Sequence, residues 1–387
     1  MESSMKKIGR EVLFLKTGEH NPRNGESTFV RLRDGRIMFA YTEYYGGNDW
    51  QDHCTARISA CYSSDEGETW TAPAILIHKP DSAQNIMSPS LLRLPDGGLG
   101  IVFLLKNVEE DLGVSCMPVF SRSDDESATW SKPISCGMPL GYYCAINDGV
   151  IVTREGKIMV PMSYHGEREN ALKRMKTPPK KRPADVRFAV SDDSGKTWHP
   201  HPHMLVSPCV DLVGLAEPGM FEHENGDLWV YMRTCLGHQY QALYTKAQDS
   251  WSPVEVNIRF TSPDAPMRVK RVGELVAAVY NPLPYNCLRT DREVWGSPKR
   301  TPLVISFSKD DGRSFDDRYL AYVYGHNLDE LVQNTYLLED DPKDSYCYPS
   351  ILEVKDGFLV SYYHSNGSPV CLNASKMVKV TYDELDA

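Results

Sequence analysis

The sequence lacks the features that mark membrane, secreted and zinc-binding proteins. No apolar run in its 387 residues approaches the roughly 20 residues that a membrane-spanning helix needs. The first residues include Lys6, Lys7 and Arg10 but no apolar segment before a cleavage site, so we expect an unsecreted, cytoplasmic protein. The ten cysteines form no CxxC pair and no paired zinc spacing, which predicts mostly small buried side chains and no metal site.

An excess of basic charge is also absent. The formal net charge is −10 at pH 7, which argues against nucleic acid or an anionic membrane as the main partner. Aromatic residues make up 10% of the chain, and it contains 27 glycines and 26 prolines. This composition suits many short strands joined by tight turns, and it does not determine the oligomeric state.

One motif of eight residues recurs along the chain. The pattern Ser-x-Asp-x-Gly-x-x-aromatic occurs at residues 63–70, 191–198 and 308–315, and a degraded copy occupies residues 123–130. In such a turn the aspartate accepts hydrogen bonds from nearby backbone N–H groups, and glycine permits positive φ. We expect the aromatic ring to fill the space between neighbouring sheets. Because the motif repeats, we predict a repeat fold.

A second repeat alternates with the first. Six segments have the pattern of a strand, a glycine turn and a second strand, with turn glycines at positions 35, 97, 156, 226, 273 and 357. Their average spacing suits one four-stranded sheet, the blade of a propeller. Residues 244–251 keep only the tryptophan of the octet. We expect residues 376–382 to pair with residues 12–15 and close the ring, which predicts an all-β, six-bladed β-propeller as a single domain over residues 1–387.

Three stretches depart from these repeats. Residues 167–185 are rich in lysine and proline and are expected to form a solvated loop of blade three or, alternatively, a lid or subunit contact. Residues 280–299 form an insert in blade five. The alternating histidines His199, His201 and His203 are expected at the surface, because no other ligand has a matching spacing.

Charged and polar residues occupy positions where a strand has no structural need for them. In a propeller, the starts of the inner strands and the loops between them converge on one mouth of the central channel. We predict that a functional site at this mouth includes the following residues: Arg23, Asp49, Asp52, Glu217, Arg233, Arg300, Tyr346 and Tyr348.

Asp-box octets in a six-bladed propeller resemble the sialidase (neuraminidase) superfamily, and the resemblance spans nearly the whole chain. Members present three arginines to a substrate carboxylate, a tyrosine nucleophile paired with a glutamate, and an aspartate acid/base on a mobile loop. The residues that match in the same chain order are Arg23, Asp52, Glu217, Arg233, Arg300 and Tyr348. The resemblance implies a retaining exo-glycosidase with Tyr348 as nucleophile, Glu217 as its base and Asp52 as acid/base, without a cofactor.

The residue types suit this chemistry. Arginine keeps its charge and offers a planar fork of donors, so three arginines can fix a carboxylate. A sugar with a carboxylate on its anomeric carbon would repel an anionic nucleophile. A tyrosine with a carboxylate base provides the attacking oxygen without a standing negative charge. The Asp then protonates the leaving oxygen and later activates water.

The chain departs from the family pattern in two places. The Arg-Ile-Pro motif is missing, because Pro22 precedes Arg23 and Asn24 follows it. A family glutamate that supports the first arginine is replaced by His364, and Glu26 is an alternative support.

Several alternatives therefore stay open. Asp52 is preferred to Asp49 by its spacing to the first octet, and Tyr346 competes with Tyr348. The expected partner is a small-molecule or glycan substrate, such as a terminal sialic acid or related nonulosonic acid. A sugar of the arabinan or uronate type, or carbohydrate binding without turnover, are the other hypotheses.

Overall fold

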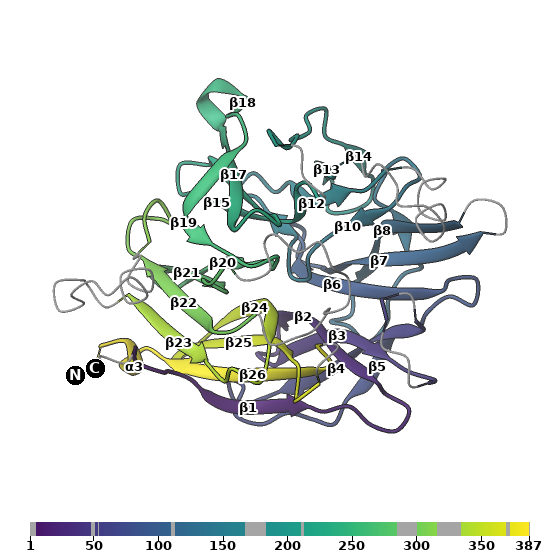
Figure 1. Cartoon of the computed structure of the whole chain (residues 1–387). Coiled ribbons are helices and arrows are strands. Elements are labelled where there is room, and N and C mark those ends of the chain that lie inside the picture. The colour runs from purple at the N-terminus through teal and green to yellow at the C-terminus, as the bar shows by residue number, and fades with distance from the viewer. Residues whose placement is uncertain are drawn as a thin grey trace.

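Six sheets arranged around a central axis make up the protein (Figure 1). The computed structural model describes residues 5–47, 51–52, 54–109, 113–166, 183–209, 213–284, 300–315, 334–368 and 372–386. Each sheet contains four or five antiparallel strands, and each blade is formed mainly by strands consecutive in the chain. The predicted all-β, six-bladed propeller is confirmed.

The blades follow one another in chain order. Blade one comprises β2 (Arg23–Arg31), β3 (Ile37–Tyr44), β4 (Ala56–Ser63) and β5 (Ala74–Ile77). Blade two comprises β6 (Asn85–Arg93), β7 (Leu99–Glu109), β8 (Gly113–Ser123) and β9 (Ile134–Ser135). Blade three comprises β10 (Tyr143–Cys144), β11 (Ile151–Val152), β12 (Ile158–Tyr164), β13 (Asp185–Ser191) and β14 (His199–Pro200).

The second half of the ring repeats this order. Blade four comprises β15 (Ala216–Glu222), β16 (Leu228–Arg233), β17 (His238–Thr245), the short helix η1 (Lys246–Gln248), β18 (Ser250–Trp251) and β19 (Glu255–Thr261). Blade five comprises β20 (Arg268–Val272), β21 (Leu275–Tyr280), β22 (Leu303–Ser308) and β23 (Thr335–Glu339). Blade six comprises β24 (Tyr346–Val354), β25 (Gly357–His364), β26 (Ala374–Thr381) and β1 (Arg10–Leu15), followed by α3 (Asp383–Asp386).

The ring closes as the sequence predicts. The six predicted hairpins are the innermost strand pairs of the six blades, and β26 pairs with β1 from Arg10↔Lys379 to Leu15↔Ser375. Before β1, Lys7 forms a bridge with Leu337 of blade five. Lys6 donates a hydrogen bond to the main-chain oxygen of Glu384 at 2.6 Å, so the two ends of the chain lie close together (Figure 1). N-terminal residues therefore tie blades five and six to each other.

Each octet forms the turn between the third and fourth strands of its blade. In the first copy, Oδ1 of Asp65 accepts hydrogen bonds from Ser63 Oγ at 2.8 Å and from the backbone N–H of Thr69 at 2.9 Å. Hydrogen bonds from the hydroxyl and the backbone N–H of Thr69 lower the pKa of Asp65 to about 2. Gly67 has a φ of +85°, which explains the glycine, since an L-residue is strained there.

The octet aromatics pack against the preceding blade. The ring centre of Trp198, in blade three, lies 5.3 Å from that of Phe120 in blade two. Phe315, in blade five, lies 6.1 Å from Trp229 in blade four. These contacts confirm that the aromatic residue fills the space between neighbouring sheets.

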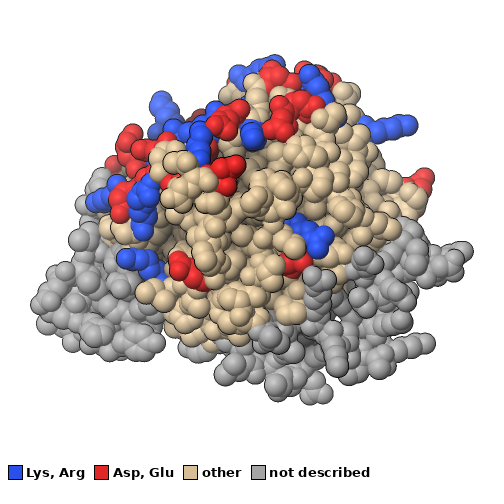
Figure 2. Space-filling model, turned by 90° about the horizontal axis from the view of Figure 1, so that it is seen from above, with Lys and Arg blue, Asp and Glu red and all other residues tan. Residues whose placement is uncertain are grey.

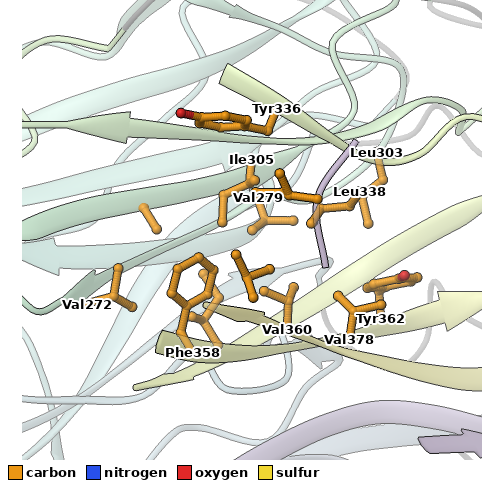
Figure 3. Packing of buried hydrophobic residues seen from close by; sticks show 14 of the residues in the cluster. Val272, Val279, Leu303, Ile305, Tyr336, Leu338, Phe358, Val360, Tyr362 and Val378 are labelled. Atoms are coloured by element: carbon orange, nitrogen blue, oxygen red, sulfur yellow. The ribbon is translucent and has the colours of Figure 1, made fainter. Parts of the chain in front are cut away.

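Between blades, the core consists of apolar side chains from facing sheets. Figure 3 shows the cluster between blades five and six, where Val279 and Ile305 face Phe358 and Val360. These four side chains are fully buried. Truncating a buried phenylalanine such as Phe358 to alanine typically costs about 3–5 kcal/mol, so this interface contributes strongly to stability.

A bulge near the start of the inner strand recurs around the ring. The pairing register shifts in β2, β6, β15 and β24. At each shift one non-glycine residue has positive φ: Glu26 (52°), Ser88 (54°), Glu217 (39°) and Tyr348 (54°). Such backbone strain costs on the order of 1–3 kcal/mol per residue, and a bulge re-aims the side chain it carries.

The surface charges are of both signs. On the face shown in Figure 2, basic and acidic side chains are interleaved along one edge, and much of the remaining described surface is uncharged. No helix within the described ranges is long and apolar enough to cross a membrane. Of the eight cysteines described, four are buried, so the prediction of mostly buried cysteines holds for half of them.

Candidate active site

Glu217, Arg233 and Tyr348 form the centre of the candidate site. The hydroxyl of Tyr348 donates a hydrogen bond to Glu217 Oε1 at 2.7 Å. Nη1 of Arg233 donates to Glu217 Oε2 at 2.5 Å and lies 3.3 Å from the Tyr348 hydroxyl. The bulges in β15 and β24 point these side chains toward each other, because Glu217 and Tyr348 are the positive-φ residues there.

Burial keeps Tyr348 in its neutral form. It raises the pKa of the phenol well above its ordinary value, and the negative charge of Glu217 raises it further. The positive charges of Arg233 and Arg300 lower the pKa of Tyr348 and partly offset this rise. A neutral phenol next to a carboxylate can act as a nucleophile only if its proton moves to that carboxylate as it attacks.

Asp264 connects the second and third arginines. Nε of Arg233 donates to Asp264 Oδ1 at 2.6 Å, and Nη2 of Arg300 donates to the main-chain oxygen of Asp264 at 2.6 Å. The guanidinium carbon of Arg300 lies 5.7 Å from the ring centre of Tyr348. Although burial lowers the pKa of Arg233, the charges of Asp264 and Glu217 raise it well above its ordinary value.

Arg23 is held from three sides at the start of β2. Its Nε donates to the Tyr363 hydroxyl at 2.8 Å, Nη1 donates to Asp52 Oδ1 at 2.5 Å, and Nη2 lies 3.4 Å from Glu26 Oε1. Ser88 donates to the other oxygen of Glu26 at 2.7 Å. Burial raises the pKa of Glu26 to about 7, although the positive charge of Arg23 lowers this pKa.

The support of Arg23 therefore comes from Glu26 and Tyr363. His364 instead lies 3.8 Å from Asp344, and its ring packs 5.1 Å from that of Tyr346. The residue at the position of the family glutamate thus points away from Arg23. Sequence reasoning named Glu26 as an alternative support, and the geometry bears this out.

Asp49 and Asp52 are the two aspartates predicted as acid/base candidates. Asp52 reaches Arg23 while its side chain stays 63% exposed. Asp49 lies outside the described residues. The choice of Asp52 over Asp49 as acid/base stays a prediction.

Tyr346 is not part of the cluster, which corrects the prediction that it binds substrate. Its side chain is only 1% exposed and packs in the core between blades five and six, 6.1 Å from the ring of Tyr362. In a regular strand, residues 346 and 348 would point to the same side. The positive φ of Tyr348 breaks this alternation, so only Tyr348 reaches the mouth.

Sequence reasoning missed three residues of the site. Asp264 lies between β19 and β20, Tyr363 precedes His364 at the end of β25, and Lys106 is near the end of β7. Of these three residues, only Tyr363 could have been predicted from the sequence, because it lies at the mouth end of a predicted hairpin. Its ring lies 5.7 Å from that of Tyr348, which links Arg23 to the central pair.

Other predicted features lie elsewhere. The loop at 167–185 and the insert at 280–299 fall mostly outside the described residues. His199 pairs with Asp192 at 2.9 Å, and the rings of His201 and His203 lie 5.4 Å apart. Within the described ranges, no three His, Cys, Asp or Glu side chains gather in a metal-binding cluster.

A cavity of about 560 Å³ lies away from the cluster. It sits at the outer part of blade four beside the octet of blade five, and its lining includes Trp229, Phe260 and Phe315. None of the predicted site residues lines it. The chemistry argues for the mouth instead, because the arginines, the carboxylates and the tyrosine meet there.

Comparison with known proteins supports this architecture. Residues 61–361 match the family model of the BNR repeat-like domain. At the level of sequence, no curated protein matches the chain.

Three solved structures illustrate the similarity. A protein of unknown function from Dyadobacter fermentans is 17% identical with a TM-score of 0.66, over 96% of this chain and 98% of that one. The NanB sialidase from Streptococcus pneumoniae is 11% identical with a TM-score of 0.64, over 98% of this chain and 71% of that one. An intramolecular trans-sialidase from Ruminococcus gnavus is 14% identical with a TM-score of 0.62, and both chains are fully covered.

At these identities the structures establish the fold and leave the substrate open. The family model covers most of the chain, and the octets form the blade turns described above. The chain therefore belongs to the BNR repeat-like family, as a sialidase-like six-bladed β-propeller.

Proposed function

We propose that the protein is a retaining exo-glycosidase that hydrolyses a terminal acidic sugar, such as a sialic acid or related nonulosonic acid. The observation that carries this proposal is the hydrogen bond of 2.7 Å from the Tyr348 hydroxyl to Glu217, with Arg233 next to both. A half-buried tyrosine with its own carboxylate base suits attack on an anomeric carbon that carries a carboxylate. The fold is shared with proteins named as sialidases.

In this proposal three arginines bind the substrate carboxylate. Arg233 and Arg300 are held together by Asp264, and Arg23 approaches from blade one. Arg23 and Arg233 are buried and Arg300 is half-buried, so water would only partly screen their interaction with a bound carboxylate. Together they would orient the anomeric carbon toward Tyr348.

The reaction then proceeds in two steps. In the first, Glu217 takes the phenolic proton, the Tyr348 oxygen bonds to the anomeric carbon, and Asp52 gives its proton to the departing oxygen. In the second, Asp52 takes a proton from water, which displaces the tyrosine oxygen, and Glu217 returns its proton to Tyr348. Two displacements at one carbon give net retention.

Hydrolysis of a fluorogenic sialoside tests the proposal. Wild-type protein should turn it over, and Tyr348→Phe should lose most of this activity because the attacking oxygen is gone. Tyr346→Phe is the control, since this tyrosine lies two residues away on the same strand but is buried in the core. Equal activity of wild type and Tyr348→Phe would exclude Tyr348 as nucleophile.

A wild type that is inactive on sialosides would refute the sialic acid assignment. Turnover of a uronide or an arabinoside would then identify the alternative sugar. Binding of an acidic sugar without turnover would identify a carbohydrate-binding propeller.

A further inference from the structure

Lys106 is a buried lysine that the mechanism above does not use. Its side chain in β7 is only 3% exposed, and it forms no ion pair with a carboxylate in the described part of the chain. Lysine is rarely buried without a partner, because removing its charge from water is costly. Its ammonium donates a hydrogen bond to the main-chain oxygen of Asp52 at 2.6 Å and lies 5.9 Å from the ring centre of Tyr142.

Asn85 acts on the same segment. It lies directly opposite Lys106 in the β6–β7 pairing and is fully buried. Its Nδ2 donates to the main-chain oxygen of Asp52 at 2.7 Å and to that of Cys54 at 2.9 Å. Blade two thus holds the backbone on both sides of residue 53, in the connection between β3 and β4 of blade one.

This anchor matters because it holds the main chain of Asp52 itself. Its side chain is 63% exposed, and Arg23 holds its carboxylate. Arg23 is also a proposed ligand of the substrate carboxylate, which would compete with Asp52 for the guanidinium. Once substrate is bound, the hydrogen bonds from Lys106 and Asn85 remain to place Asp52 over the mouth.

We propose that Lys106 and Asn85 are positioning residues that hold the Asp52 segment in place for proton transfer to the leaving group. This inference rests on the proposed function, in which Asp52 is the acid/base. Neither side chain need touch the substrate. Their contribution is to fix the main chain from which the Asp52 carboxylate extends.

The dependence on leaving group tests this role in Lys106→Met. The variant keeps the aliphatic stem and removes the donor. With an aryl leaving group, which departs readily without a proton, kcat should fall only a few-fold. With a sugar leaving group, which needs protonation, kcat should fall by about 100-fold or more, since general acid catalysis contributes on the order of 10²–10⁴-fold.

Lys379→Met is the matched control. Lys379 is also 3% exposed, but it binds Glu68 and Asp356, at an octet and a blade turn far along the strands from the mouth. Its loss should affect both substrates equally. An equal loss on both substrates in Lys106→Met as well would overturn the positioning role.

Hydrogen exchange provides a readout that does not depend on activity. Backbone amides of residues 51–54 should exchange faster in Lys106→Met than in wild type, and should be unchanged in Lys379→Met. Unchanged exchange in Lys106→Met would overturn the anchor itself. Inactivity of the wild type on every acidic sugar would overturn the proposed function and the catalytic role of the anchor, while exchange would still show whether Lys106 holds the segment.

Discussion

Tyr363 offers a sharp test of how the first arginine is held. Its hydroxyl accepts the Nε–H of Arg23 at 2.8 Å, and both side chains are buried. Tyr363→Phe removes one oxygen and leaves a guanidinium N–H without this acceptor. Hydrogen bonds to charged groups contribute about 1.5–3 kcal/mol, and each 1.4 kcal/mol is tenfold in an equilibrium constant.

The expected result is a KM for an acidic sugar raised by about 10- to 100-fold, with a much smaller effect on kcat. The reason is that Arg23 binds a carboxylate that is present in both the ground state and the transition state. Steady-state kinetics on a fluorogenic substrate measures both constants.

Tyr362→Phe is the control for this experiment. Tyr362 is the neighbouring residue, is also fully buried, and donates to Glu339 at 2.7 Å in the core between blades five and six. It should lower thermal stability and leave KM unchanged. If both variants raised KM equally, the effect would come from general loosening of blade six, and the role given to Tyr363 would be refuted.

Three further predictions concern stability. The pKa of Glu26 in the folded protein is raised to about 7 from an ordinary value of 4.5. The wild type should therefore lose stability as pH rises from about 4.5 to 7. Thermal unfolding curves of Glu26→Gln should lack this pH dependence. The pKa of Asp65 is lowered to about 2 from 3.8, so its stabilising contribution is present above pH 3.8 and is lost as pH falls toward 2. The difference in melting temperature between wild type and Asp65→Asn should therefore shrink as pH falls over that range. Gly195→Ala should destabilise the protein by about 1–3 kcal/mol through backbone strain at a φ of +84°. A clash should add to this cost, because the new Cβ would lie 2.4 Å from the ring of Phe120. Gly35→Ala, with a φ of +89° and open space around it, should show the strain alone in denaturant titrations.

Most of the fold could be predicted because its determinants are local. An octet carries its own aspartate, glycine and aromatic residue, so each blade turn is encoded within eight residues. The closing pair of β26 and β1 was also predictable, because one strand was left over at each end of the repeat. The central triad of Glu217, Arg233 and Tyr348 followed from its place at strand ends.

The remaining site residues depend on contacts between blades. Asp264 binds two arginines from different blades, and Lys106 reaches from blade two to the backbone of blade one. Neither pairing has a periodicity in the sequence. Tyr346 was misplaced for a different reason: strand alternation places it beside Tyr348, and a bulge cannot be recognised from that alternation.

The recurring bulge explains how a repeat fold can assemble a site without symmetry. The same strained position carries glutamate in blades one and four, serine in blade two and tyrosine in blade six. Blade five has an unbroken register in its β20–β21 pair, and its candidate residue, Arg300, instead comes from the segment before β22. Each strained position costs stability, yet four blades keep a non-glycine residue there. Three of these four side chains bind another member of the candidate site directly, and the fourth, Ser88, binds Glu26. At these four positions the strained backbone turns side chains toward the mouth, which is the arrangement expected of a site that the fold supports at the expense of stability.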